Sequence, residues 1–463
     1  MTDLVTRPAP TGGPEPTAVA GPALRLGLPL AVLAVIGLGV ATGNGVYVLG
    51  FVAFVLALLL SVTLHEAGHF LTARHYGMKS TQFFVGFGPT LWSRRRGELE
   101  YGIKAVPAGG FVKIVGMTQL EEVDPADDAR AFWRRPARQR AVVLAAGSTV
   151  HGIIAVVLVL LSSLAIGKGA ETTPGIGAVS ECVTVAADGD CADPGSVPAP
   201  ALAAGFQVGD LVTSVGGIPV AGVVELVSEL RRYPDQRVAV SVLRDGATLE
   251  LSVSPTAVTR PSLEPQLDAA GEVVLGADGE PVFPLERVGA VGVLPQFNQG
   301  TERLGPLEAV GHSVDTGRQM VTGIVDTFTE KLGTITQVYG PDRDPAGFVG
   351  VVGAGRISGE VIASDETFSV KVLQFVLLIA GLNLFVGVFN LLPLLPLDGG
   401  HLAVLAYEKV RHRIRQARGY AGEMLRVDLT RLLPLTYGVV LLFGAFTVWL
   451  LGADIVNPIR LPQ

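Results

Sequence analysis

Residues 49–73 read LGFVAFVLALLLSVTLHEAGHFLTA, and this stretch decides what kind of fold the chain has. A run of about 20 apolar residues is long enough to cross roughly 30 Å of hydrocarbon as a helix. Three ionisable side chains, those of His65, Glu66 and His69, interrupt the run within two helical turns. Such groups are energetically unfavourable in a membrane helix unless they face a cavity or a partner. The stretch therefore predicts a membrane helix that carries a polar site.

The rest of the chain is also too apolar for a soluble protein. Its 463 residues are 49% hydrophobic, with a mean hydropathy of +0.47. This composition predicts a polytopic α-helical membrane protein with about five transmembrane helices. The helices are expected at 25–48, which is an extra N-terminal span, and at 49–79, 141–167, 370–400 and 432–463.

Charge predicts which side of the membrane each connection faces. The connection 74–140 holds 12 Lys/Arg against 7 Asp/Glu, whereas 168–370 holds 12 against 27. By the positive-inside rule the first connection is cytoplasmic, as are a disordered tail at 1–24 and a basic segment at 401–431, and the second is extracytoplasmic. The expected location is the plasma membrane. No cationic cluster is interleaved with aromatic residues and the net charge is −7, so no nucleic-acid partner is expected.

The connections are expected to hold β-structure. Glycine-broken alternation in 80–140 predicts a small, membrane-associated β-hairpin region on the cytoplasmic side. The order of strands and one helix in 168–258 resembles a PDZ domain, an extracytoplasmic α+β unit. A linker and an amphipathic membrane-surface helix are expected in 259–369. Cys182 and Cys191 fall in the extracytoplasmic part, where they either form a short-loop disulfide or stay unpaired.

The histidines suggest a metal site. His65 and His69 are four residues apart, so they project from one face of a helix and can reach one metal ion. Glu66 follows the first histidine and is placed to act as catalytic base. A catalytic metal usually needs a third protein ligand. Asp398 is the lone carboxylate of the apolar run 390–401; alone it would more often mark a helix end, but the charge pattern places both motifs in the cytoplasmic leaflet.

Taken together, these motifs resemble the site-2 proteases, the metalloproteases of regulated intramembrane proteolysis. The resemblance rests on the HEAGH motif, the glycine pair of 86–88, the PDZ-like unit, and the stretch 390–399 with its Asn-x-x-Pro and Leu-Asp-Gly elements. It implies one zinc ion per chain, bound by both histidines and Asp398. It also implies four substrate-binding residues: Asn390, Pro393, Gly86 and Gly88.

Within this family the chain resembles the actinobacterial branch, through Tyr101-Gly102-x-Lys104-Ala105-Val106-Pro107 and the terminal Asn457-Pro458-Ile459-Arg460. This resemblance implies an endopeptidase that cuts transmembrane segments of single-span proteins, such as anti-sigma factors trimmed by a first extracytoplasmic cleavage. The substrate helix must be unwound first, and the sheet in 80–116 offers an edge to which an extended segment could add. The chain departs from the family where Gly147-Ser148-x-x-His151 replaces Gly-Pro-x-x-Asn. We expect His151 to be a buried packing residue.

Two other classes of function compete with a protease. A non-catalytic membrane scaffold or metal-binding chaperone would recruit partners through the PDZ-like unit, but it should lack the base or a ligand, and neither is missing. A zinc transporter would need polar ligands spread over several spans. The spans near 141–166 and 432–453 offer almost none.

Overall fold

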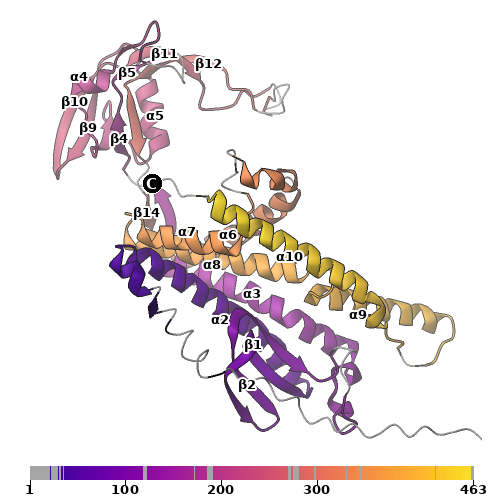
Figure 1. Ribbon diagram of the computed structural model, residues 1–463. Coiled ribbons are helices and arrows are strands. Elements are labelled where there is room, and N and C mark those ends of the chain that lie inside the picture. Colours follow the sequence, from indigo (N-terminus) through magenta and orange to yellow (C-terminus); the bar gives the residue numbers. More distant parts are fainter. Residues whose placement is uncertain are drawn as a thin grey trace, which may run out of the picture. The chain divides into compact units, whose positions relative to one another are not determined.

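The computed structural model describes residues 21, 30, 33–34, 36–117, 123–171, 173–184, 191–268, 273–274, 281–296, 299–329, 331–340, 343, 347–422 and 424–459. The chain divides into two compact units, whose elements Figure 1 labels. We call them the helical unit (Met1–Ala165, Leu304–Asp365 and Lys371–Gln463) and the strand-rich unit (Ile166–Arg303 and Glu366–Val370).

Within the described residues, four helices are long and apolar enough to cross a membrane. They are α2 (Gly45–His75), α3 (Ala137–Ala165), α8 (Phe368–Asn390), and α10 (Leu433–Val456) with the preceding turn η4 (Leu429–Leu432). The extra span expected at 25–48 lies partly outside the described residues. Its residues 36–41 are helical, and the chain then turns at Thr42 and Gly43 before α2 begins.

Helix α3 packs closely against both α2 and α8 because glycines lie at the contacts. A Cβ on Gly68 of α2 would stand 2.9 Å from the carbonyl oxygen of Ala146 in α3. A Cβ on Gly387 of α8 would stand 3.2 Å from the carbonyl oxygen of Ser148. Small residues let helix backbones approach closely in apolar surroundings, where dispersion contacts supply much of the association. Figure 1 shows α2 and α3 side by side.

The span expected at 370–400 is two helices. Helix α8 ends at Asn390, and α9 begins only at Asp398 and runs to Ala417. Pro393 and Pro396 lie in the turn between them, and a proline lacks the N–H that would continue the helical hydrogen bonds. Much of the basic segment expected at 401–431 is therefore helix.

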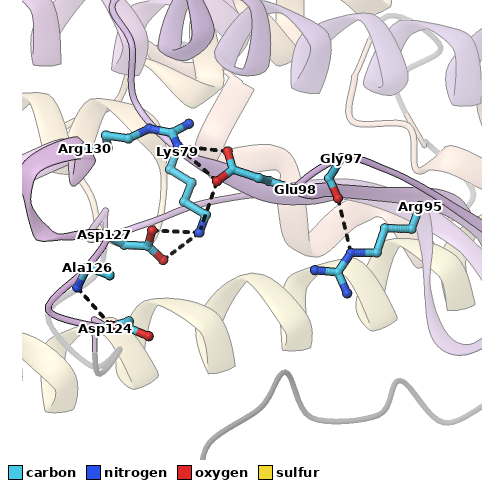
Figure 2. A network of polar contacts seen from close by, with 8 residues as sticks. All are labelled: Lys79, Arg95, Gly97, Glu98, Asp124, Ala126, Asp127 and Arg130. Atoms are coloured by element: carbon cyan, nitrogen blue, oxygen red, sulfur yellow. Dashed lines mark hydrogen bonds and ion pairs between the residues drawn. The ribbon is translucent and has the colours of Figure 1, made fainter.

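The hairpin expected within 80–140 folds back on itself. Strands β1 (Ser80–Arg96) and β2 (Leu99–Ile114) form a two-stranded sheet, in which residues 82–85 pair with 110–113 and also with 100–103. Lys79 and Glu98 flank β1 and lie 3.6 Å apart, and Glu98 also binds Arg130 at 2.9 Å (Figure 2). These ion pairs hold Glu98, in the turn between β1 and β2, close to Lys79 at the start of β1. The short helices η1 (Asp128–Arg130) and η2 (Phe132–Arg134) follow.

The strand-rich unit is built on a sheet in the order β10-β9-β7-β4-β13, with β8 paired to β7. Leu226 of helix α5 (Val223–Arg231) packs into a core with Val212 and Val240 of the sheet. The other elements are α4 (Pro200–Ala204), β3 (Lys168–Glu171), β4 (Gly175–Val179), β5 (Cys182–Val183), β6 (Val197–Pro198), β7 (Leu211–Val215), β8 (Ile218–Pro219), β9 (Val238–Arg244), β10 (Ala247–Val253), β11 (Thr256–Pro261), β12 (Leu285–Ala290), β13 (Val293–Gln296) and β14 (Gln299–Glu302). A disulfide joins Cys182 to Cys191.

The expectation of a linker throughout the first part of 259–369 is wrong. Strand β13 pairs with β4 and β14 pairs with β3, so this chain segment completes the strand-rich unit up to Arg303. Pairing partners more than 100 residues apart leave no local periodicity, which is why the sequence suggested a loop. The remaining residues form α6 (Pro306–Thr329), η3 (Lys331–Tyr339) and α7 (Val351–Ala363).

Candidate metal centre

Three side chains from distant parts of the sequence meet in the helical unit. His65 and His69 of α2 and Asp398 of α9 each offer one ligand atom, and these atoms lie within 4.8 Å of one another. The two Nε2 atoms are 3.1 Å apart, and Asp398 Oδ2 lies 3.5 Å from His65 Nε2 and 3.3 Å from His69 Nε2. The structure thus brings together the three residues that the sequence singled out as ligands.

These three groups fit a metal ion better than they fit one another. The Nδ1 atom of His69 lies 2.7 Å from the carbonyl oxygen of Val143, to which it donates, so a neutral ring presents its Nε2 lone pair to the cluster. Asp398 Oδ2 is buried and accepts no hydrogen bond from the described residues. Nitrogen and oxygen ligands about 2.0–2.1 Å from a tetrahedral ion stand about 3.3 Å apart, which matches the observed separations.

Two glycines after Asp398 allow this candidate ligand to begin a helix in a crowded place. Asp398 is the first residue of α9. A Cβ on Gly400 would stand 2.5 Å from the backbone nitrogen of Leu395, and one on Gly399 would collide with the carbonyl of Leu391. The turn after α8 therefore lies directly against the first turn of α9. This explains in steric terms why glycines follow the aspartate.

Gly147 of α3 makes room for the histidines, a role that sequence reasoning missed. A Cβ at this position would stand 2.5 Å from His69 Nε2 and 2.6 Å from His65 Nδ1. Any larger residue would push both imidazoles away from Asp398. Gly147 was visible as part of the motif in the third span, but only the packing of α3 on α2 shows what it faces.

Glu66 lies beside the last part of β2. It is half-buried, and a Cβ on Gly110 would stand 3.3 Å from Glu66 Cγ. Glycine inside a strand often marks the close approach of another group. The Gly109-Gly110 pair is therefore a signal in the sequence for this contact.

The other four predicted site residues lie elsewhere. Gly86 and Gly88 have φ angles of +88° and +79°, and a Cβ on Gly86 would stand 2.8 Å from the carbonyl oxygen of Val106. Within the chain, this glycine pair therefore shapes the hairpin. Asn390 ends α8 and is half-buried, and its side chain has no hydrogen-bond partner among the described residues; Pro393 is exposed in the turn before α9.

His151 is buried beside the cluster. Its Nδ1 lies 2.8 Å from Asn383 Oδ1, and its ring centroid lies 5.0 Å from that of His65. Asn383 Nδ2 also donates to the carbonyl of Ile379. A hydrogen bond between residues 232 positions apart in the sequence joins α3 to α8 at the level of the cluster.

Comparison with known proteins decides the family. The sequence profile described as Peptidase family M50 matches residues 53–427, a range that contains all three candidate ligands and Glu66. The chain belongs to this family. Membership confirms the resemblance to the site-2 proteases and makes the chain a metalloendopeptidase with a membrane location.

Relatives from several organisms support the M50 assignment. The chain is 37% identical over 428 residues to "Zinc metalloprotease Rip1" of Mycobacterium tuberculosis (strain H37Rv), which covers 90% of this chain and all of the relative. It is 26% identical to "Metalloprotease MmpA" of Caulobacter vibrioides, over 81% of this chain and 91% of the relative. It is 29% identical to "Membrane metalloprotease ARASP, chloroplastic" of Arabidopsis thaliana, over 76% and 68%.

Proposed function

We propose that the chain is a zinc-dependent intramembrane endopeptidase that hydrolyses peptide bonds in transmembrane segments of single-span proteins. The observation that supports this best is the place of the ligand cluster. His65 and His69 are buried residues of α2, a helix apolar enough to span a membrane, and they meet the half-buried Asp398. A metal site built there serves a substrate that is itself inside the bilayer.

The residues around the cluster have separate roles in this proposal. His65, His69 and Asp398 hold one zinc ion, for which imidazole and carboxylate are suitable ligands. When bound, zinc supplies a Lewis acid that polarises the scissile carbonyl and makes water more acidic. Glu66 accepts the proton of the attacking water and returns it to the leaving amine.

We propose that the substrate adds as a strand to the edge of β2 beside Glu66. Among the described strands, residues 110–113 pair only with 82–85, so their other edge has no described strand partner, and the Glu66 carboxyl accepts a hydrogen bond from the backbone of Val112. An unwound substrate segment has free amides that such an edge can satisfy, and strand addition is a common mode of peptide binding. The contact of Gly110 with Glu66 brings this edge to the base. This proposal places the substrate at one defined strand edge, whereas the sequence named only Gly86 and Gly88 within the hairpin.

Asn390 and Pro393 complete the proposed substrate contacts. The Asn390 amide has no hydrogen-bond partner among the described residues, and this leaves it available for the substrate backbone or the developing oxyanion. Pro393 ends the helical hydrogen bonding of α8 and lies in the turn that brings Asp398 to the histidines.

We further propose the arrangement in the membrane that the charges predict. A fifth span at 25–48 precedes α2, the cluster lies toward the cytoplasmic leaflet, and the strand-rich unit is extracytoplasmic. The strand-rich unit acts as a PDZ-like domain that excludes substrates with untrimmed ectodomains. Anti-sigma factors left by a first extracytoplasmic cleavage are the substrate class that we propose.

The direct test compares wild type and Glu66→Gln on a single-span test substrate in proteoliposomes. Loss of a general base lowers the cleavage rate by roughly 10²–10⁴-fold. The zinc content, measured on the same samples, should be unchanged because Glu66 is not a ligand. Equal cleavage by the two proteins at equal zinc content would overturn the proposed mechanism.

The role of the strand-rich unit is tested by deleting 166–303 and offering trimmed and untrimmed forms of the same substrate. Size exclusion predicts that the deletion variant cleaves both forms, whereas wild type cleaves only the trimmed one. Loss of cleavage of the trimmed form, in a variant that still binds zinc, would instead indicate that the unit docks the substrate.

A further inference from the structure

Helix α9 exposes an apolar stripe. Tyr407, Val410 and Ile414 are 57%, 55% and 49% exposed, and their spacing of three and four residues places them on one face. About half of the surface of each of these three residues is therefore left open within the helical unit. A face with three large apolar side chains in a row is unusual for a surface that meets only water.

The opposite face of α9 is firmly packed, so the exposure of the stripe is a fixed property of the fold. Leu405 is buried in a cluster with Val143 and Leu144 of α3. Glu408 is 4% exposed, and its carboxylate lies 3.6 Å from Arg140 and accepts the backbone N–H of Val427 at 2.8 Å. These contacts fix how α9 is rotated about its own axis.

Cations border the stripe on both sides. Arg411 lies 5.7 Å from the ring of Tyr407 and Arg415 lies 5.3 Å from that of Tyr420, so their charged groups are held by aromatic rings on one side. Lys409 and Arg413 are exposed on the other side. An apolar centre with cationic borders is the pattern of helices that lie in the interface of an acidic membrane.

The position of α9 in the chain identifies the membrane as the partner. The helix begins eight residues after the end of α8 and ends sixteen residues before the start of α10. Both neighbours are long and apolar enough to span a bilayer. A 20-residue helix tied at both ends to spans stays near the bilayer surface, within reach of lipid headgroups.

We propose that α9 lies in the headgroup layer of the membrane, with its apolar stripe among the acyl chains and its four bordering cations on acidic phospholipids. Asp398 is the first residue of this helix. Docking on acidic lipid therefore holds the helix that carries a candidate metal ligand, and acidic lipid should raise protease activity. This last consequence rests on the proposed function, whereas the docking itself does not.

The test uses the absence of free thiols among the chain's two cysteines, both of which are in the disulfide. A single Ile414→Cys or Gln416→Cys substitution can be labelled with an environment-sensitive fluorophore in the full-length protein. The two positions are two residues apart, about 200° around the helix. In vesicles of phosphatidylcholine and phosphatidylglycerol, brominated acyl chains should quench the label at 414 and leave the label at 416 largely unaffected.

Charge removal separates acidic-lipid docking from simple hydrophobic burial. In the Ile414→Cys background, Lys409→Gln with Arg413→Gln should lower the ratio of membrane-bound to unbound α9 in acidic vesicles. The expected decrease is roughly fivefold for each cation removed. The matched control, Arg237→Gln with Arg303→Gln in the strand-rich unit, should leave the ratio unchanged. The variant with Lys409→Gln and Arg413→Gln should cleave substrate more slowly than wild type in acidic vesicles. In pure phosphatidylcholine the cleavage rates of the two proteins should be equal.

Three results would overturn the proposal. Equal quenching at 414 and 416 would show that the stripe does not face lipid. Protection of the 414 label from an aqueous quencher without quenching by bromolipid would mean that a protein covers the stripe. Quenching at 414 that is identical in acidic and neutral vesicles would remove acidic lipid as the partner, even if Glu66→Gln abolishes cleavage.

Discussion

Two aspartates of the helical unit, Asp454 and Asp398, differ in how the charge of their buried oxygens is compensated. Asp454, near the end of α10, is 4% exposed, and both of its oxygens accept hydrogen bonds. Oδ1 accepts from Arg343 at 2.9 Å and Oδ2 from the backbone N–H of Gly353 at 2.8 Å. Asp398 faces two histidines, and its buried Oδ2 accepts no hydrogen bond from the described residues.

This difference separates a structural carboxylate, whose charge is already compensated, from a carboxylate that still needs a cation. A charge taken out of water is costly unless a partner compensates it. The chain supplies Asp454 with its partners, so the Asp454 site is complete. Asp398 meets imidazole nitrogens instead of a permanent cation, and a metal ion satisfies all three groups together. A buried acceptor without a donor is therefore more informative here than burial alone.

The largest expected effect follows from filling the space beside the histidines. Gly147→Ala places a methyl group 2.5 Å from His69 Nε2, which displaces the ligand ring. Even loss of groups that only orient ligands costs about 10–100-fold in metal affinity or activity, so displacement of two ligands should exceed that. Zinc content and cleavage rate of the purified variant measure the effect.

Gly152→Ala is the matched control on the same helix. A Cβ at Gly152 has nothing within 4 Å, so this substitution should keep full zinc content and activity. If both alanine variants behave alike, the role assigned to Gly147 is wrong.

Breaking the ion pair of Asp454 should lower the folding stability of the protein and leave its zinc content unchanged. Arg343→Ala leaves the Asp454 carboxylate buried without its cation, and such a change costs about 3–5 kcal/mol of folding free energy. Denaturant unfolding of the purified protein measures the loss, with the exposed Arg318→Ala as control. Loss of zinc from the folded fraction of Arg343→Ala would show that the two aspartate sites are not independent.

A smaller effect is expected at the contact between His151 and Asn383. Asn383→Ala removes the acceptor of a buried imidazole N–H, which costs about 1–3 kcal/mol. Asn383→Asp, which retains an acceptor oxygen, should restore part of the stability. Zinc content should stay at the wild-type level, because His151 lies beside His65 without belonging to the ligand set.

A third buried aspartate extends the comparison to the strand-rich unit. Hydrogen bonds from Arg244, at 2.6 and 2.8 Å, lower the pKa of the Asp210 carboxyl. The unfolded chain then binds this proton at higher pH than the folded unit does. The stabilisation is complete above the unfolded pKa of about 3.9 and is lost as the pH falls through the lower folded pKa.

Amide hydrogen exchange of β7 and β9 in the full-length protein measures this dependence. Protection should fall as the pH drops below about 4, after correction for the intrinsic exchange rate. In Arg244→Gln the fall should be smaller, because the pKa of Asp210 then returns toward its ordinary value. An unchanged acid profile in that variant would show that other carboxylates dominate.

The sequence could predict the ligands but not the shape of the space around them. His65 and His69 share a face through the helical period alone, and Asp398 was assigned from charge topology and the family resemblance. Gly147 and Asn383 act across contacts between helices, which no local pattern encodes. That Gly86 and Gly88 contact the substrate stays a prediction; their close approach to the backbone of β2 and the contact of Gly110 with Glu66 come from the double pairing and packing of the hairpin, which no local pattern encodes.

We expect Asp398 to complete a metal site, whereas Asp454 completes an ion pair with Arg343. The most direct test is the zinc content of purified wild type, Asp398→Asn and Asp454→Asn, each checked for folding. The account predicts one zinc ion per chain in wild type and in folded Asp454→Asn, and almost none in Asp398→Asn. Full zinc content in Asp398→Asn, or equal loss in both folded variants, would contradict it.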